Sequence, residues 1–243
     1  MPSREDWMKR LGPLYGGAVA LVHSTPWRWP ETVSDGHEAR SAFWVVAVGL
    51  PIGVVAYAVA ALLHAAGLPL TICAFAGLAA LTLASAALVE KGLVARIDGA
   101  HASGPSVPAI VVLVFTLLIR AAAIAAVSHD HWLGLFLATA LTGRWAAVFL
   151  QGLGDPIVDD DAPRSLVATP APAWLTAAIS IGVATLVILA LGKRGIVALA
   201  VTAAVAFGLG LDAQRRDRGL SSPVVATAAA IGELAVLLVA SLS

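Results

Sequence analysis

The chain has little charge. Only 12% of its 243 residues are charged, whereas soluble globular proteins carry about 25%. Hydrophobic residues make up 59% of the chain, and the mean hydropathy is +0.89. This balance excludes an ordinary soluble domain and indicates an integral membrane protein.

Two further shortages exclude other classes of protein. The single cysteine, Cys73, lies in an apolar run, so a disulfide framework and a cysteine metal site are both excluded. Fifteen basic residues balance fifteen acidic ones, and this zero net charge argues against a nucleic-acid partner. The first thirty residues mix basic residues, tryptophans and prolines in an order unlike a signal peptide, so we expect an interfacial anchor there.

The apolar runs predict an all-α fold, a polytopic membrane helical bundle of about seven transmembrane helices. Each run is close to the roughly 20 residues that a bilayer requires. We expect residues 1–42 to form an interfacial N-terminal segment and residues 43–243 a single transmembrane domain. The predicted spans are 43–65, 69–89, 107–128, 131–150, 172–191, 195–211 and 222–241.

The distribution of charge predicts an orientation. Most charged residues lie before the first span or in connections that are an even number of crossings away, so they share one side of the membrane. The positive-inside rule makes that side cytoplasmic and leaves Lys193 and Arg194 opposite. We therefore expect a multi-pass protein of the cell inner membrane, with its N-terminus and charged loops in the cytoplasm.

Three ionisable residues fall within or near the ends of the predicted spans: Arg120, Arg144 and Glu233. A charge at membrane depth costs a few kcal/mol and usually faces a partner or a wet cavity. For the arginines, snorkelling or a structural ion pair is the alternative to a functional role. An Arg120–Glu233 or Arg144–Glu233 pair is the hypothesis that the sequence offers.

The connection after the fourth predicted span is rich in glycine and aspartate. Asp155 and Asp159–Asp161 could hold a divalent cation through carboxylate oxygens, or could simply be solvated. Gly152 and Gly154 could let backbone amides approach a phosphate. The histidines are scattered, and we predict no histidine metal site.

The segment Leu88–Gly99 gathers Glu90, Lys91, Arg96 and Asp98 between two apolar runs and has the outline of a phosphotransfer motif. Together with other segments it resembles the cobalamin (5′-phosphate) synthase family, also called adenosylcobinamide-GDP ribazoletransferase. The segments that carry the resemblance are Leu21–Pro26, Glu90–Leu93, Asp98–Gly99, Leu118–Ala123, Gly143–Arg144, Gly152–Gly154 and Ala230–Leu234.

The resemblance implies a Mg²⁺-dependent transferase that joins adenosylcobinamide-GDP to α-ribazole or its phosphate and releases GMP at the cytoplasmic face. Metal ions would neutralise charge that develops on the attacking and leaving oxygens. It implies catalytic Asp98, Glu233 and Arg144; substrate-binding Gly99, Arg120, Gly152 and Gly154; and metal-binding Glu90, Asp98, Asp155 and Asp159.

The chain departs from the family pattern at several acids. Val89, Lys91 and Ala95 stand where the motif has a histidine and two aspartates, and Ala230 replaces a glutamate. The Thr-Gly-Asp step of the family reads Ser221-Ser222-Pro223 here, and Ala100 to Pro108 is too short for the family's next basic segment. A lysine in place of an aspartate opposes cation binding directly.

Three readings follow. The first is an active but divergent transferase that acts on a nucleotide-activated corrinoid and a ribazole. The second is a catalytically silent paralogue that serves as a membrane scaffold or accessory subunit, as a homo-oligomer or within a larger complex in the lipid. The third, a transporter lined by Arg120, Arg144 and Glu233, is disfavoured because the sequence shows no matching pair of interrupted half-helices.

Overall fold

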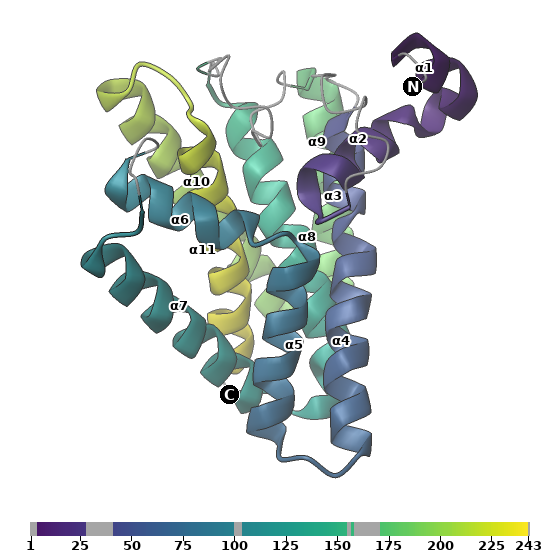
Figure 1. Cartoon of the computed structure of the whole chain (residues 1–243), viewed down its shortest axis with the longest axis vertical. Helices are drawn as coiled ribbons and strands as arrows, with labels where there is room; N and C mark the ends of the chain where they lie inside the picture. The colour runs from purple at the N-terminus through teal and green to yellow at the C-terminus, as the bar shows by residue number, and fades with distance from the viewer. Residues whose placement is uncertain (1–3, 28–40, 100–103, 155–156, 158–170, 243) are drawn as a thin grey trace.

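The computed structural model describes residues 4–27, 41–99, 104–154, 157 and 171–242. The regular elements in this part of the chain are helices, as predicted (Figure 1). They are α1 (Arg4–Leu11), η1 (Gly12–Leu14), α2 (Tyr15–Ser24), α3 (Ser41–Ala47), α4 (Gly49–Ala65), α5 (Leu70–Ala84), α6 (Leu88–Asp98), α7 (Val107–Ala126), η3 (His129–His131), α8 (Trp132–Gln151), α9 (Ala173–Leu191), α10 (Lys193–Arg216) and α11 (Ser222–Ser241).

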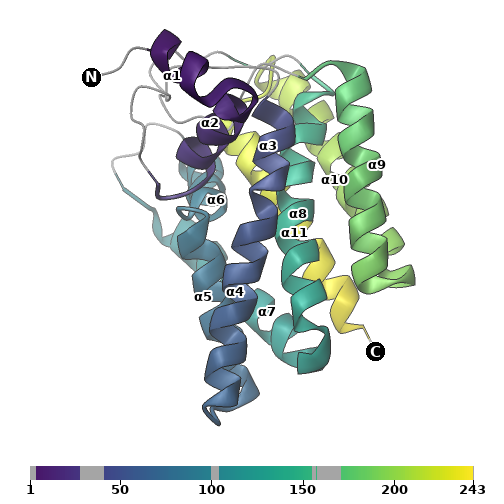
Figure 2. The ribbon, with the colours of Figure 1, turned by 90° about the vertical axis from the view of Figure 1, so that its right-hand side faces the viewer.

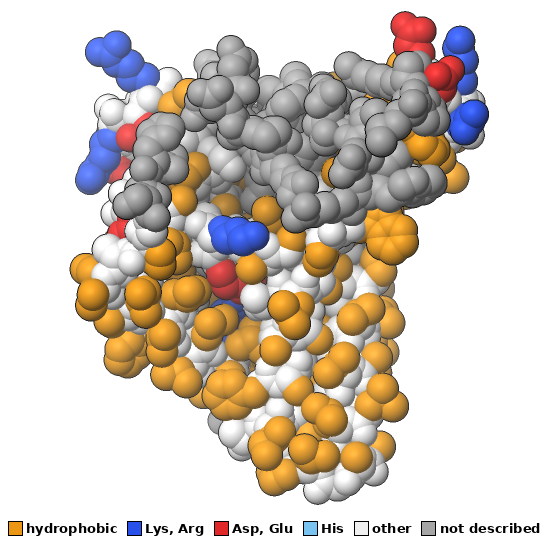
Figure 3. Space-filling model, in the orientation of Figure 1, with side chains coloured by type: hydrophobic (Ala, Val, Ile, Leu, Met, Phe, Trp, Pro, Cys, Tyr) orange, Lys and Arg blue, Asp and Glu red, His pale blue; other side chains and the backbone are white. Residues whose placement is uncertain are grey.

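The helices confirm a polytopic membrane bundle. Within the described residues, six stretches are long and apolar enough to cross a bilayer, and α5 with α6 would make a seventh if the bent pair is one span. Hydrophobic side chains cover the lower part of the molecule, and charged side chains gather mainly towards the end where the grey atoms lie (Figure 3). The apolar belt is the surface that a bilayer would surround.

The second predicted span differs from the observed helix. The prediction is one span over residues 69–89, but α5 ends at Ala84 and α6 follows it at an angle of 78°. Ala86 and Ala87 break the helix, since both have positive φ, 55° and 52°. Alanine is the best helix former, so two alanines at this point predict that the helix continues. Left-handed alanines cost about 1–2 kcal/mol each, and the surrounding packing must offset that cost.

The bundle is built around α8 and α11, which lie at its centre (Figures 1 and 2). Small residues bring the helices close together. A Cβ added at Gly53 of α4 would lie 2.9 Å from the Leu137 Cα of α8. A Cβ added at Gly232 of α11 would lie 3.1 Å from the Ala146 Cβ of α8. Such close approach is typical of membrane helices, whose association depends on van der Waals packing.

Helix α6 lies across the bundle, near the end at which α10 finishes (Figure 1). Its contact with α11 is so close that a Cβ added at Gly92 would lie 2.0 Å from the Ala226 Cβ. The sequence segment expected to connect two spans is therefore itself a helix packed on the core. This placement turns Glu90, two residues before Gly92, into the protein.

Candidate functional site

A buried cluster of charged residues joins three helices beneath the charged end of the bundle. Arg120 of α7 donates a hydrogen bond from Nη1 to Glu90 Oε1 of α6 over 2.9 Å. Its Nη2 forms an ion pair with Glu233 Oε2 of α11. The three residues are 1%, 7% and 2% exposed, so water screens their interactions little. We call Glu90, Arg120 and Glu233 the buried cluster.

The buried cluster has a polar support on α5. Thr82 Oγ1 donates a hydrogen bond to Glu90 Oε1 over 2.9 Å. The Arg120–Glu233 pair is one of the two pairings that the sequence suggested, but the sequence did not predict that Glu90 shares the same guanidinium. Thr82 was missed altogether, because a threonine in an apolar helix is not by itself a signal. Only the bend after α5 brings Thr82 and Glu90 face to face.

Arg144 of α8 lies beside the buried cluster. Its neighbour Gly143 is so close to Glu233 that an added Cβ would lie 2.9 Å from Glu233 Oε1. The Arg144 side chain is 8% exposed, and its Nη1 donates to the Ala140 carbonyl oxygen over 3.2 Å. With two glutamates and two arginines, the region has a formal charge that sums to zero. A self-neutralised group of this kind is the form in which charge is tolerated at membrane depth.

Several polar atoms around the buried cluster have no hydrogen-bond partner among the described residues. They are Glu90 Oε2, Arg120 Nε, Thr142 Oγ1 and Arg144 Nε. A buried polar group without a partner costs free energy. Each of these atoms could form a hydrogen bond with a polar group placed against it.

A second ionic group includes another residue of α6 but lies nearer the surface. Arg96 of α6 contacts Asp212 Oδ2 at 3.3 Å and Asp217 Oδ2 at 3.0 Å. Arg216 Nε contacts Asp212 Oδ1 at 2.6 Å. We call Arg96, Asp212, Arg216 and Asp217 the surface cluster. It ties α6 to the end of α10, and no pattern in the sequence predicts it.

Asp98, expected to be catalytic and metal-binding, is engaged elsewhere. Its Oδ2 accepts a hydrogen bond from the Ser106 backbone N–H over 2.8 Å, and its Oδ1 accepts one from the Ser106 hydroxyl. Ser106 is the N-cap of α7 and itself accepts from the Ala109 N–H over 3.3 Å. In this structure Asp98 links the end of α6 to the start of α7.

The three glycines expected to bind substrate lie apart from the buried cluster. Gly99 ends α6 with a φ of 85°, and Gly152 ends α8. A Cβ added at Gly154 would lie 2.3 Å from Gln214 Nε2 of α10. Gly154 therefore permits close packing between the end of α8 and α10.

Where the structure describes them, the acids that the resemblance assigns to Mg²⁺ are bound to other residues. Mg²⁺ demands octahedral oxygen ligation and is usually held by one or two carboxylates with several waters. Within the described ranges, no group of three or more His, Cys, Asp or Glu residues gathers where it could hold a metal ion. Glu90 and Glu233 share a guanidinium, and Asp98 is bound to Ser106. Asp155 and Asp159, the other two expected ligands, lie outside the described residues.

Comparison with known proteins identifies the family. A family model described as cobalamin-5-phosphate synthase matches residues 17–241, nearly the whole chain. The chain therefore belongs to the cobalamin-5-phosphate synthase family, and the resemblance seen in the sequence is confirmed. Membership of this family associates the chain with cobalamin synthesis by a membrane transferase. No curated protein and no solved structure matched the chain.

Proposed function

We propose that this member of the cobalamin-5-phosphate synthase family joins adenosylcobinamide-GDP to α-ribazole or α-ribazole phosphate and releases GMP. One observation carries the proposal. Four segments that bear the family resemblance, on α6, α7, α8 and α11, converge on the buried cluster and Arg144. Charged residues at membrane depth usually mark a functional site, and here they come from distant parts of one matched sequence.

The reaction is a displacement at phosphorus. A hydroxyl oxygen of the ribazole forms a bond to the phosphorus nearer the corrinoid, and the bond from that phosphorus to the bridging oxygen breaks. GMP leaves with the bridging oxygen, and the hydroxyl proton is released. The protein must position the two reactants and stabilise negative charge on the transferred group.

The basic side chains of the site are suited to stabilising negative charge on the transferred group. Arg120 is already bound to two glutamates, whereas Arg144 Nη1 donates to a neutral group, the Ala140 carbonyl oxygen. Lys91 is exposed on α6, next to Glu90 in the chain. Arg144 and Lys91 are therefore the cations that we propose to contact the diphosphate. Dependence on Mg²⁺ stays a prediction that now rests on Asp155 and Asp159, and no step above requires it.

We place the site at the cytoplasmic face of the inner membrane. Helix α1 and the end of α10, both of which carry charged residues, lie at the same end of the bundle as α6, the helix that carries Glu90 (Figure 1). By the positive-inside rule that end faces the cytoplasm, where polar nucleotide-bearing substrates would arrive.

The second candidate function is that of a catalytically silent paralogue acting as a membrane scaffold or accessory subunit. A specific observation favours it. Arg120 already pairs with both buried glutamates, and Lys91 stands in place of a motif acid. A positive charge at these points opposes the binding of a catalytic cation.

The experiment that separates the two candidates measures turnover. The purified protein in lipid nanodiscs would receive adenosylcobinamide-GDP and α-ribazole phosphate, with and without Mg²⁺, while GMP release is followed. We expect release that falls at least tenfold in Arg144→Gln, and a Gln214→Ala variant serves as a control away from the buried cluster. No release from folded protein, beside an active family member, would reject the transferase and support the silent paralogue.

A further inference from the structure

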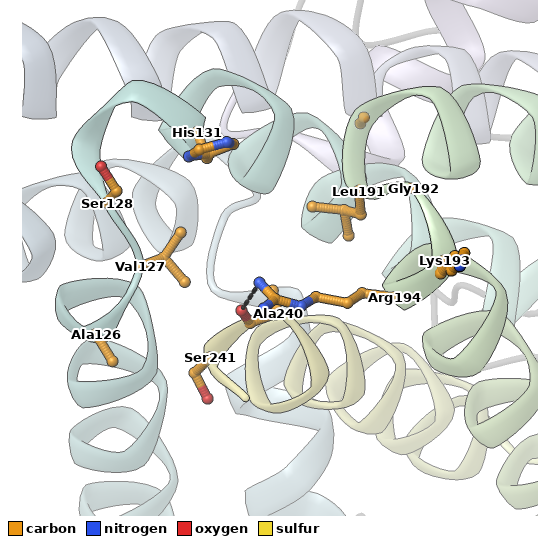
Figure 4. A pocket seen from close by; sticks show the side chains of 11 residues that line it. Ala126, Val127, Ser128, His131, Leu191, Gly192, Lys193, Arg194, Ala240 and Ser241 are labelled. Atoms are coloured by element: carbon orange, nitrogen blue, oxygen red, sulfur yellow. Dashed lines mark hydrogen bonds between the residues drawn. The ribbon is translucent and has the colours of Figure 1, made fainter. Parts of the chain in front are cut away.

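A cavity of about 570 Å³ lies at the start of α10, the end of that helix opposite the surface cluster. It forms where α7 passes into α8, where α9 passes into α10 and where α11 ends (Figure 4). Its volume is within the roughly 300–1,000 Å³ range of small-molecule sites. Because these are the ends of membrane-crossing helices, the cavity lies at the level where lipid headgroups meet water.

The cavity is basic. Lys193 and Arg194 both line it, and none of its lining residues is an aspartate or a glutamate. The Arg194 side chain reaches across the cavity, where its Nη1 donates to the Ala240 carbonyl oxygen over 3.2 Å (Figure 4). A guanidinium has five N–H donors, so this one hydrogen bond fixes the group and leaves other donors for a ligand. Gly192 and Lys193 also begin α10, whose N-terminus adds positive partial charge.

Apolar surface continues from the cavity along the two helices that bring its cations. Leu189 of α9 is 78% exposed, and Ile196 and Val197 of α10 are 55% and 51% exposed. Each lies within four residues of Lys193 or Arg194 in the chain. A free phosphate would use only the cations, whereas an amphiphile would use the cations and the apolar surface together.

We propose that this cavity binds the phosphate group of an anionic phospholipid. Lys193 and Arg194 contact the phosphate, and the acyl chains lie along the exposed apolar sides of α9 and α10. Each Lys or Arg near a membrane surface attracts anionic lipid by about 1 kcal/mol. The proposal does not depend on the transferase reaction, because the cavity and the buried cluster lie at different levels of the bundle.

Native mass spectrometry of the full chain in detergent would test this site, with phosphatidylglycerol as the probe. We expect retained phosphatidylglycerol adducts in the unaltered protein. Lys193→Gln and Arg194→Gln should each lower apparent affinity by about fivefold, the effect of one basic side chain near a lipid surface. Arg194→Lys should retain most of the binding. Arg215→Gln is the matched control, because Arg215 is an exposed arginine at the other end of α10.

Each other outcome would overturn the proposal. If Arg215→Gln lowered adduct formation as much as Lys193→Gln, lipid binding would depend on general charge rather than on this cavity. If inorganic phosphate at equal concentration displaced the lipid, the ligand would be a free anion. Unchanged binding in the Lys193→Gln/Arg194→Gln double variant would also reject the site. Lys193→Gln keeps the test valid even if loss of the Arg194–Ala240 hydrogen bond disturbs the end of α11.

Discussion

Two ionic clusters hold the same helix in different surroundings. On one side of α6, Glu90 is buried with Arg120 and Glu233, each less than a tenth exposed. Six residues later, Arg96 meets Asp212 and Asp217 with side chains 29%, 38% and 35% exposed. The charged groups of the buried cluster have lost their contact with water, so each of them depends on its partners in the protein. The surface cluster can exchange a lost partner for water.

The two clusters should differ in how much each contributes to the stability of the fold. Both clusters link α6 to distant parts of the chain, but only the buried cluster should make the fold depend on a single side chain. The surface cluster should adjust the position of α6 with little effect on stability. Four substitutions test this difference, and they are given in order of decreasing expected effect.

Removing the central guanidinium should have the largest effect. Arg120→Ala leaves Glu90 and Glu233 buried without their cation, and breaking a buried pair costs about 3–5 kcal/mol. The free energy of unfolding, measured in mixed micelles by denaturant titration, should fall by that amount. A triple variant with Arg120→Met, Glu90→Gln and Glu233→Gln should recover part of the loss. Equal stability of Arg120→Ala and the unaltered protein would show that the buried cluster is not a structural unit.

Forcing α6 away from α11 should have the next largest effect. Gly92→Leu places a side chain where a Cβ alone would lie 2.0 Å from the Ala226 Cβ. Overpacking of this kind costs about 1–3 kcal/mol, and the shift should also misplace Glu90. Melting temperature would report the loss. Gly104→Leu is the control, because a Cβ added there meets nothing within 4 Å; a similar loss in both variants would contradict the close α6–α11 contact.

Breaking the link between α6 and α7 should have a smaller effect. Asp98→Ala removes two hydrogen bonds to Ser106, and loss of such a helix-end interaction costs about 1 kcal/mol. We expect a modest fall in melting temperature and faster backbone hydrogen exchange at the start of α7. Ser106→Ala should cause a fall of similar size. If GMP release is present and Asp98→Ala abolishes it while Ser106→Ala does not, Asp98 has a chemical role beyond this link.

Removing the surface arginine should have the smallest effect. Arg96→Ala breaks two half-exposed ion pairs, and such pairs contribute about 0–1 kcal/mol each. The loss should shrink further at 1 M salt, where the Debye length falls to about 3 Å. Stability measured at low and high salt would show this convergence. A loss as large as that of Arg120→Ala would erase the distinction between the two clusters.

Particular residues show where sequence reasoning succeeded. The long apolar runs could be read directly, because bilayer thickness fixes how many apolar residues a helix needs. A partner for Glu233, either Arg120 or Arg144, could be expected, since an uncompensated charge in an apolar span is costly. The family resemblance rested on short segments around these same residues, and the match over residues 17–241 confirms it.

Other residues show where it failed. Ala86 and Ala87 do not predict the interruption between α5 and α6, because alanine favours a helix over a turn. Without the bend, Glu90 could not be placed next to Thr82, and the Leu88–Gly99 segment read as a connection instead of a helix. Asp98 read as a ligand because of its motif position, whereas the structure engages both of its carboxylate oxygens with Ser106.

The sequence by itself determined that this protein is a helical membrane bundle and that Arg120, Arg144 and Glu233 must find partners inside it. Composition and the length of the apolar runs decide those properties, because the bilayer sets the length and polarity that each spanning segment needs, independently of the other segments. The tertiary structure alone decided that one guanidinium serves two glutamates and that α6 lies across the core. It also decided that Lys193 and Arg194 meet the end of α11 at a cavity. These outcomes depend on how distant helices pack, and packing is a property of all the contacts together.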